Sequence, residues 1–259
     1  MKPRVWLRTK IQVCVVALLL CGIAFSGEPK SVLFVGNSFT FHNDLPGVFS
    51  RLAKANGKET QVRKATQSGY SLHQHSTQAK TLAAISSQKW DVVILQGLSV
   101  EPIIAQEKMV AATKVLVEKC GDARCILFMT WAYKSKNPLG RKLIGSPLTP
   151  DDVFPKMQQL LEDGYRDAAQ AAHIDVAPVG LAWAAARKAH PEWELYKGDQ
   201  YHSSMTGTCL TAVVFYRAIY GELPTRFPEE KAVDRTIYSQ MVDAVETVPA
   251  KDDSNKRQQ

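Results

Sequence analysis

Short apolar runs alternate with longer segments of mixed polarity along the chain. Four of these runs are almost continuously apolar, at residues 32–35, 91–95, 125–129 and 174–179. Runs of this length and character are typical of strands that are covered on both faces of a parallel sheet. A further, more polar strand is predicted at residues 61–65.

Helical spacing fills the intervals between these strands. Leu45, Val48 and Leu52 recur at a helical period, with Asn43 or Asp44 as the N-terminal cap. Further helices are predicted at residues 82–87, 109–119, 153–172, 181–189 and from 205 or 206 to 220. Strands separated by helices predict an α/β fold of three layers, α/β/α, around a mainly parallel, flavodoxin-like sheet.

The N-terminus has the pattern of a secretory signal peptide over residues 1–26. Four basic residues precede an apolar stretch at residues 11–24, and small residues at 24 and 26 suit a signal peptidase. A retained membrane anchor is the alternative, whereas lipidation at Cys21 is disfavoured by the bulky Leu20 before it. We expect an exported protein, periplasmic or extracellular, with one domain at residues 27–250 and a disordered polar tail at 251–259.

Charge argues against nucleic acid as a partner. The net charge is +7, from 32 Lys and Arg against 25 Asp and Glu. Without the four basic residues of the leader the balance is 28 to 25, or +3, and the basic residues are scattered. That is too little for a phosphate-binding surface. No stable membrane insertion is expected once the signal has been cleaved.

The cysteines leave one question open. Two of the five lie in the leader, and Cys120 and Cys125 flank residues 121–124. In an exported protein this pair either closes a small disulfide loop or remains as two free thiols. Cys209 has the position of a buried apolar residue on a helix. No cysteine spacing typical of zinc is present, and no metal or other cofactor is expected.

The candidate chemistry lies in two distant segments. Ser38 follows the first apolar strand and a small residue, which places a hydroxyl at the carboxyl end of a strand, where open α/β sheets build their sites. Asp199 and His202 stand three residues apart before the last long helix. A serine, a base to take its proton and a carboxylate to orient that base form a complete nucleophilic set.

Each half of this set also has a purely structural interpretation. A serine at a strand turn is often structural, and Asp199 could cap a helix while His202 is merely exposed. The hypothesis therefore depends on whether the two segments meet in the fold.

Four blocks of the sequence resemble, in order, those of the SGNH (GDSL-like) hydrolase superfamily, and most closely a bacterial branch of it. They are residues 36–39 (Gly-Asn-Ser-Phe), 69–75 (Gly-Tyr-Ser-Leu-His-Gln-His), 95–96 (Leu-Gln) and 199–203 (Asp-Gln-Tyr-His-Ser). The resemblance implies a catalytic triad of Ser38, His202 and Asp199. It also implies an oxyanion hole formed by the backbone N–H groups of Ser38 and Gly69.

The chain departs from the superfamily pattern at two positions. Gln96 stands where a third oxyanion donor, an asparagine, is usual, and Asn37 replaces the acidic residue before the serine. The Gln96 amide is one methylene longer, which leaves its reach toward the oxyanion open.

Three further features carry weaker expectations. His73 and His75 would share a face if they lay on a strand, but two imidazoles without a carboxylate make an incomplete metal site. We expect His75 to face the substrate, with an exposed histidine as the alternative. Trp131 follows a strand and is expected to stack on a sugar at the rim of the site, with simple packing as the alternative. Residues 134–152 form either a wall or lid over the site or a mobile surface loop.

The leading hypothesis is an exported serine esterase that cleaves short acyl groups from a carbohydrate through an acyl-enzyme. The partner would be a small-molecule or glycan ester. A non-catalytic carbohydrate-binding or envelope protein on the same fold and an acyltransferase are the alternatives. The sequence leaves open the acyl group, the alcohol and the oligomeric state.

Overall fold

Five parallel strands form the sheet at the centre of the molecule. A computed structural model of the chain describes residues 30–134, 137–144, 150–230 and 233–249. Within these residues the strand order is β2-β1-β3-β4-β5, and every neighbouring pair is parallel. The strands are β1 (Lys30–Gly36), β2 (Thr60–Thr66), β3 (Val92–Leu95), β4 (Arg124–Phe128) and β5 (Asp175–Ala177). This is the flavodoxin-like order, which confirms the predicted fold class.

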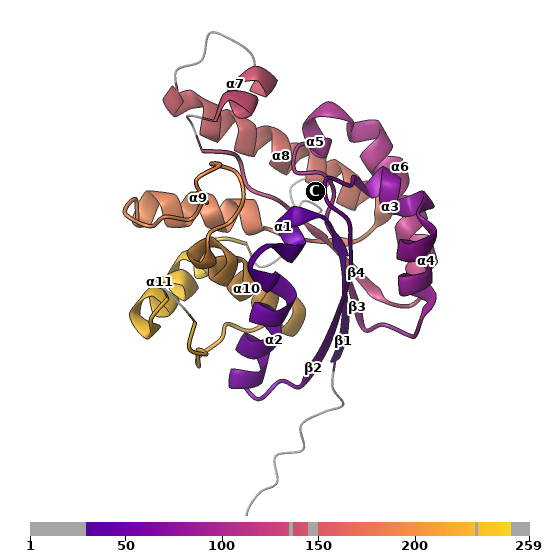
Figure 1. Ribbon diagram of the computed structural model, residues 1–259, viewed down its shortest axis with the longest axis horizontal. Helices are drawn as coiled ribbons and strands as arrows, with labels where there is room; N and C mark the ends of the chain where they lie inside the picture. Colours follow the sequence, from indigo (N-terminus) through magenta and orange to yellow (C-terminus); the bar gives the residue numbers. More distant parts are fainter. Residues whose placement is uncertain (1–29, 135–136, 145–149, 231–232, 250–259) are drawn as a thin grey trace, which may run out of the picture.

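Helices cover both faces of the sheet (Figure 1). One face packs against α2 (Leu45–Ala55), α9 (Val179–Ala189), α10 (Met205–Tyr220) and α11 (Arg235–Glu246). The other face packs against α3 (Leu72–Thr77), α4 (Ala79–Ser86), α6 (Gln106–Cys120) and the C-terminal part of α8 (Pro150–Ala172). The shorter elements are α1 (Ser38–Phe41), the 3₁₀ turn η1 (His42–Asp44), α5 (Glu101–Ile104) and α7 (Pro138–Ile144).

The continuous apolar runs follow from burial on both faces. In β1, Val32 and Phe34 belong to the core beneath α2 and α10, and Leu33 and Val35 belong to the core beneath α3 and α6. None of these four residues is more than 1% exposed. Because successive side chains of a strand point to opposite faces, a strand between two helical layers has no polar side.

The structure differs from the sequence-based prediction mainly at short or capped elements. β5 ends at Ala177, because Pro178 caps α9 and turns the chain into that helix. The helices α3 and α11 were not predicted. Each begins at a polar N-cap, Ser71 and Asp234, whose side chain accepts a hydrogen bond from the first turn.

The two candidate disulfide residues are free thiols. Cys120 ends α6 and is partly exposed, whereas Cys125 is buried in β4. Cys209 is buried in α10, as predicted, and its sulfur accepts a hydrogen bond from the Tyr238 hydroxyl at 3.2 Å.

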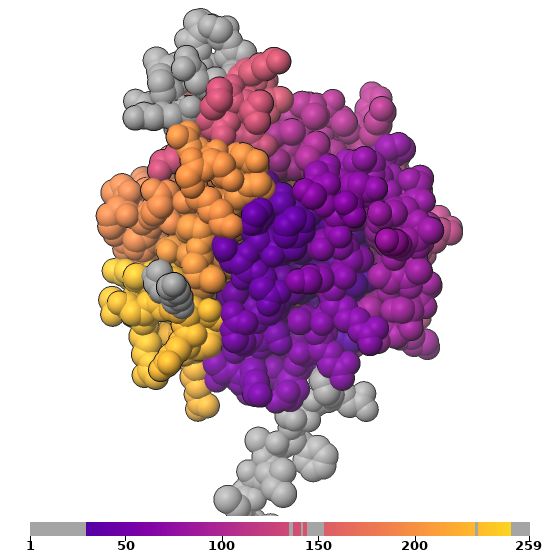
Figure 2. Space-filling view, viewed as in Figure 1, coloured from indigo at the N-terminus to yellow at the C-terminus, as the bar shows by residue number. Residues whose placement is uncertain are grey.

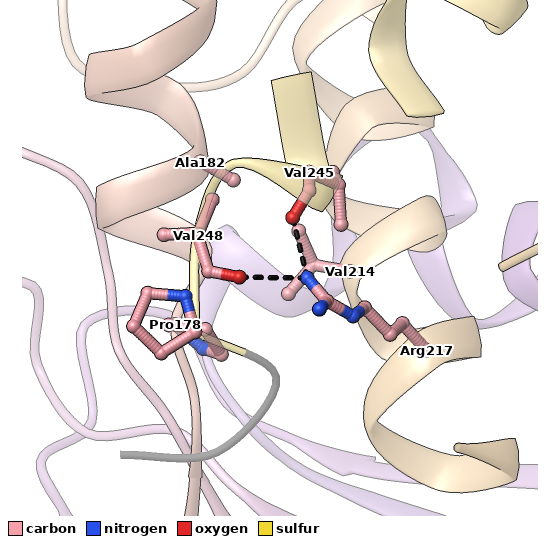
Figure 3. A pocket seen from close by; sticks show the side chains of 7 residues that line it. Pro178, Ala182, Val214, Arg217, Val245 and Val248 are labelled. Carbon is pink, nitrogen blue, oxygen red and sulfur yellow. Dashed lines mark hydrogen bonds between the residues drawn. The ribbon is translucent and has the colours of Figure 1, made fainter. Parts of the chain in front are cut away.

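Arg217 of α10 closes the end of α11. Its Nη1 donates to the carbonyl oxygens of Val245 and Val248 at 2.5 and 2.7 Å (Figure 3). Carbonyls at a helix end have no partner within the helix, so the guanidinium satisfies them. The small hollow beside Arg217 is lined mainly by apolar side chains and contains none of the site residues predicted from the sequence.

The predicted leader, residues 1–26, and the predicted tail, residues 251–259, lie outside the described residues and stay predictions. Within the described ranges, no helix combines the length and apolar character needed to cross a membrane.

Gly207 offers a test of the packing at the start of α10. A Cβ at this position would lie 2.4 Å from the Leu195 carbonyl oxygen and 2.6 Å from the Trp183 ring. We therefore expect Gly207→Ala to lower the free energy of unfolding by about 1–3 kcal/mol, measured by urea denaturation. In the control Gly198→Ala the new Cβ meets no atom within 4 Å, and the change should stay within about 0.5 kcal/mol. Equal losses in the two variants would contradict this packing.

Candidate active site

Ser38 is the first residue of α1, directly after the end of β1. The Asn37 side chain caps this short helix by accepting the Phe39 N–H at 3.1 Å. The strands β2 and β3 lie on opposite sides of β1, so the strand order reverses at β1. Ser38 therefore lies at the carboxyl edge of the sheet, at the topological switch point where ligands bind in open α/β folds.

The structure brings Ser38, His202 and Asp199 together. The Ser38 hydroxyl lies 2.8 Å from His202 Nε2, and His202 Nδ1 lies 2.7 Å from Asp199 Oδ2. In Figure 2 the indigo surface of the N-terminal segment meets the orange surface of the segment that precedes α10. The three side chains thus form one continuous chain of hydrogen bonds, although 164 positions separate the serine from the histidine.

Asp199 has the environment of an ionised carboxylate. Burial raises its pKa, but hydrogen bonds from the His202 side chain and from the backbone N–H groups of His202 and Tyr201 outweigh that effect, so the pKa lies below its ordinary value. A carboxylate that accepts from Nδ1–H leaves His202 Nε2 as the acceptor for the serine proton. Gln200, with φ of 68°, supplies the tight turn that lets Asp199 reach all three donors.

The segment from Asp199 to Ser203 is held by its own carbonyl groups. Each of its five carbonyl oxygens accepts a hydrogen bond from a different donor. In chain order the donors are Asn137 Nδ2, the Lys134 N–H, Trp131 Nε1, the Lys197 N–H and Asn43 Nδ2, at 2.8–3.1 Å. Four of these donors come from outside the immediate turn, so the fold fixes where the base stands relative to the serine.

The predicted oxyanion donors are the backbone N–H groups of Ser38 and Gly69, and this role stays a prediction. Neither the Ser38 N–H nor the Gly69 N–H donates to another residue in the described part of the chain. Gly69 is exposed and has φ of 70°, and a Cβ there would meet nothing within 4 Å. Glycine is therefore favoured here by backbone conformation and not by lack of space.

Asn37 connects the loops around this position. Its Nδ2 donates to the Tyr70 carbonyl at 2.8 Å and to the Gly97 carbonyl at 3.0 Å. A carboxylate, the usual group before the serine in the superfamily, cannot donate these bonds. Sequence reasoning noticed the replacement but not its role.

Gln96 does not supply the third oxyanion donor. The residue is fully buried, and its Oε1 accepts from the Asn37 N–H at 2.9 Å and the Thr40 hydroxyl at 2.8 Å. Its Nε2 donates to the Gly97 carbonyl. The buried amide holds the turn that carries Ser38, so the prediction for this residue is wrong.

His75 does not face a substrate either. It is fully buried in α3, with Nε2 3.0 Å from the Gly36 carbonyl and Nδ1 2.8 Å from the Thr81 hydroxyl. Burial is the main influence on its pKa, which lies below the ordinary value. A neutral ring donates from Nε2 to Gly36, so His75 supports the end of β1. The sequence Ser71-x-x-Gln74 is a capping box, a signal that predicts a helix here and not a strand.

Trp131 is not a sugar platform at the rim. Only 1% of it is exposed, its Nε1 donates to the Tyr201 carbonyl at 2.9 Å, and its ring stacks between Phe39 and Trp183. The alternative interpretation, packing, is the correct one. Lys134 and Asn137 show that part of residues 134–152 anchors the Asp199 segment. Residues 135–136 and 145–149 lie outside the described residues.

Glu101 is a buried residue that sequence reasoning missed. Its carboxylate, 1% exposed, accepts the backbone N–H groups of Leu72 and Leu98 at 2.9 and 3.0 Å and that of His73 at 3.4 Å. It therefore joins the start of α3, which follows the Gly69 loop, to the loop after β3. Among the described residues, no three histidine, cysteine or carboxylate side chains are grouped so that they could hold a metal ion.

Comparison of the sequence with models of known families and with curated proteins finds no match. Solved structures do match. A DUF4886 family protein from Bacteroides uniformis is 21% identical, with a TM-score of 0.72 over 84% of this chain and 93% of its own. A proposed SGNH hydrolase from Slackia heliotrinireducens is 26% identical, with a TM-score of 0.59 over 72% of this chain and 97% of its own. An acetyl xylan esterase variant from Geobacillus stearothermophilus is 15% identical, with a TM-score of 0.52 over 79% and 99%.

The chain thus has a three-layer α/β/α fold with Ser38 at the switch point of the sheet. The structural match to a proposed SGNH hydrolase supports the SGNH (GDSL-like) superfamily, which the sequence blocks resemble.

Asn43 tests the link between the two halves of the site. It has φ of 52°, and its Nδ2 donates to the Ser203 carbonyl and to the Thr208 hydroxyl, both at 2.9 Å. Asn43→Gly keeps the left-handed backbone and removes both bonds, so we expect a loss of about 1–3 kcal/mol in the free energy of unfolding. Asp44→Gly, at the same φ in an exposed residue, is the matched control. Calorimetry should show the larger loss in the Asn43 variant, and the reverse order would contradict the link.

Glu101 predicts a dependence of stability on pH. Burial raises its pKa above the ordinary 4.5, although three backbone N–H groups oppose the shift. The folded state therefore binds more protons than the unfolded state between the two pKa values, and the free energy of unfolding falls as pH rises through that window. Glu101→Gln removes this titration, so the stability of the wild type relative to the variant should decrease above about pH 4.5. Urea unfolding of both proteins at a series of pH values measures this difference in the free energy of unfolding. If the wild type instead gained stability relative to the variant as pH rises, the prediction would be contradicted.

Proposed function

We propose that the protein is a serine esterase that acts through an acyl-enzyme. The observation that carries this proposal is the unbroken chain of hydrogen bonds from Ser38 through His202 to Asp199. In the first step Ser38 Oγ attacks the ester carbonyl carbon as its proton passes to His202 Nε2. The Asp199 carboxylate stabilises the imidazolium that results.

The tetrahedral intermediate would place its oxyanion against the N–H groups of Ser38 and Gly69. Both groups are free of partners among the described residues, so they can donate without breaking a bond in the protein. The imidazolium then returns its proton to the leaving alkoxide, and the alcohol departs from an acylated Ser38. Water attacks this ester with His202 again as base, which releases the acid and restores the hydroxyl.

The substrate is proposed to be a short acyl ester of a carbohydrate outside the cytoplasm. The predicted leader supports export, and one protein of the same fold is described as an acetyl xylan esterase. Trp131 no longer supports a sugar, because the ring is buried. The proposal for the acyl group and the alcohol therefore rests on the compartment and on the chemistry of the site.

A fluorophosphonate probe tests the nucleophile. Attack by Ser38 Oγ on phosphorus expels fluoride, and the adduct is located by mass spectrometry of the digested protein. We expect labelling of wild type at Ser38, none in Ser38→Ala, and a loss of at least about 10⁴-fold in turnover of an acetyl ester in that variant. Ser86→Ala, in the exposed end of α4, is the control and should label normally. An adduct at another residue, or unchanged turnover in Ser38→Ala, would defeat the proposal.

A further inference from the structure

A second histidine packs against the base of the proposed triad. His42 lies four positions after Ser38, in the turn that follows α1, and its ring centroid is 4.3 Å from that of His202. Its Nδ1 lies 2.8 Å from Nζ of Lys197, which precedes His202 by five positions. Each of the two segments that meet at the site therefore contributes one member of a lysine–histidine pair.

The contact with Lys197 determines the tautomer of the His42 ring. An ammonium group can only donate, so Nδ1 of His42 must accept and the ring proton sits on Nε2. Burial, His202 and the Lys197 charge together hold the pKa of His42 below its ordinary value, against a smaller opposing effect of Asp199. His42 thus remains neutral and presents Nε2–H as a fixed donor, with no acceptor among the described residues.

The charge of Lys197 is not compensated locally. Three other lysines of the described residues pair with carboxylates: Lys58 with Glu222, Lys64 with Asp44 and Lys134 with Glu194. In the described part of the chain, no carboxylate forms an ion pair with Lys197. Asp199, the nearest acidic residue in the sequence, uses its two oxygens for His202 and Tyr201. A half-buried ammonium and a neutral N–H donor therefore lie side by side next to the base.

The direction of proton transfer places this pair on the alcohol side of the substrate. His202 gives its proton to the leaving alkoxide, so the alcohol must lie against the imidazole when the ester breaks. His42 packs on that same imidazole, and Lys197 is bonded to His42. Whatever binds Lys197 and His42 Nε2 is consequently a part of the alcohol.

We propose that Lys197 and His42 recognise a carboxylate on the alcohol part of the substrate, as in an acyl ester of a uronic acid. This inference rests on the proposed esterase function and narrows its substrate class. A carboxylate accepts from both donors at once and neutralises the ammonium, whereas a neutral hydroxymethyl group leaves that charge uncompensated.

Matched substrates test the inference. The probes are methyl glycosides of glucuronic acid and of glucose, acetylated at the same ring hydroxyl, so that they differ only in a carboxylate. We expect wild type to prefer the uronate in kcat/KM by about tenfold at low ionic strength, since bonds to charged groups are the stronger ones, and added salt should reduce that preference. In Lys197→Met the ratio should fall to about one. Lys64→Met, which removes a partly exposed lysine paired with Asp44, should keep the preference.

The outcomes separate the inference from the function on which it rests. Equal turnover of both glycosides by wild type, a preference for the glucose ester, or an equal loss for both in Lys197→Met would overturn the inference. So would Ser38-dependent hydrolysis of 4-nitrophenyl acetate with no turnover of either glycoside, and in each of these cases the esterase proposal stands. Absence of Ser38-dependent turnover of every ester would end both.

Discussion

The structure depends on holding one irregular segment in place. Residues 199–203 form no regular helix or strand that could satisfy their backbone, yet a buried or half-buried carbonyl needs a donor. Five donors from three stretches of the chain meet this need, namely residue 43, residues 131–137 and residue 197. Because these bonds form only in the folded chain, the position of His202 relative to Ser38 is fixed before any substrate arrives.

This dependence explains what the sequence could and could not predict. The strands were predictable because burial on both faces leaves continuous apolar runs such as residues 32–35. The approach of Ser38 to His202 was a hypothesis from the residue types, from the place of Ser38 after a strand and from the order of the motifs. The donors to residues 199–203 could not be predicted, since a tryptophan N–H at 131 and a carbonyl at 201 leave no mutual signal in the sequence. Trp131 was therefore assigned to the rim when its ring supports the segment from beneath.

The two departures from the superfamily pattern belong to one arrangement. Asn37 can donate from its amide where an acidic residue cannot, and it uses both protons to hold the Tyr70 and Gly97 carbonyls. Gln96 has the length to turn back and accept the Asn37 N–H and the Thr40 hydroxyl. Asn37 and Gln96 thus hold the turn before Ser38 together, because the Asn37 N–H donates to Gln96 Oε1 and both side chains donate to the Gly97 carbonyl. Position within a motif did not determine the role of Gln96, because burial decided which partners its amide could meet.

The His202 ring is constrained on its edges and on its faces. Asp199 and Ser38 occupy its two nitrogen atoms, while the rings of Phe39, His42 and Tyr201 pack around it at centroid distances of 5.4, 4.3 and 4.1 Å. A ring flip would exchange nitrogen for carbon at both hydrogen bonds, so it would lose both partners at once. Small displacements of a reacting group cost large factors in rate. In the proposed mechanism the surrounding rings would therefore matter to the chemistry even though none of them exchanges a proton. The neutral His42 suits this place, because a second cation against the imidazolium would oppose the transfer that Asp199 favours.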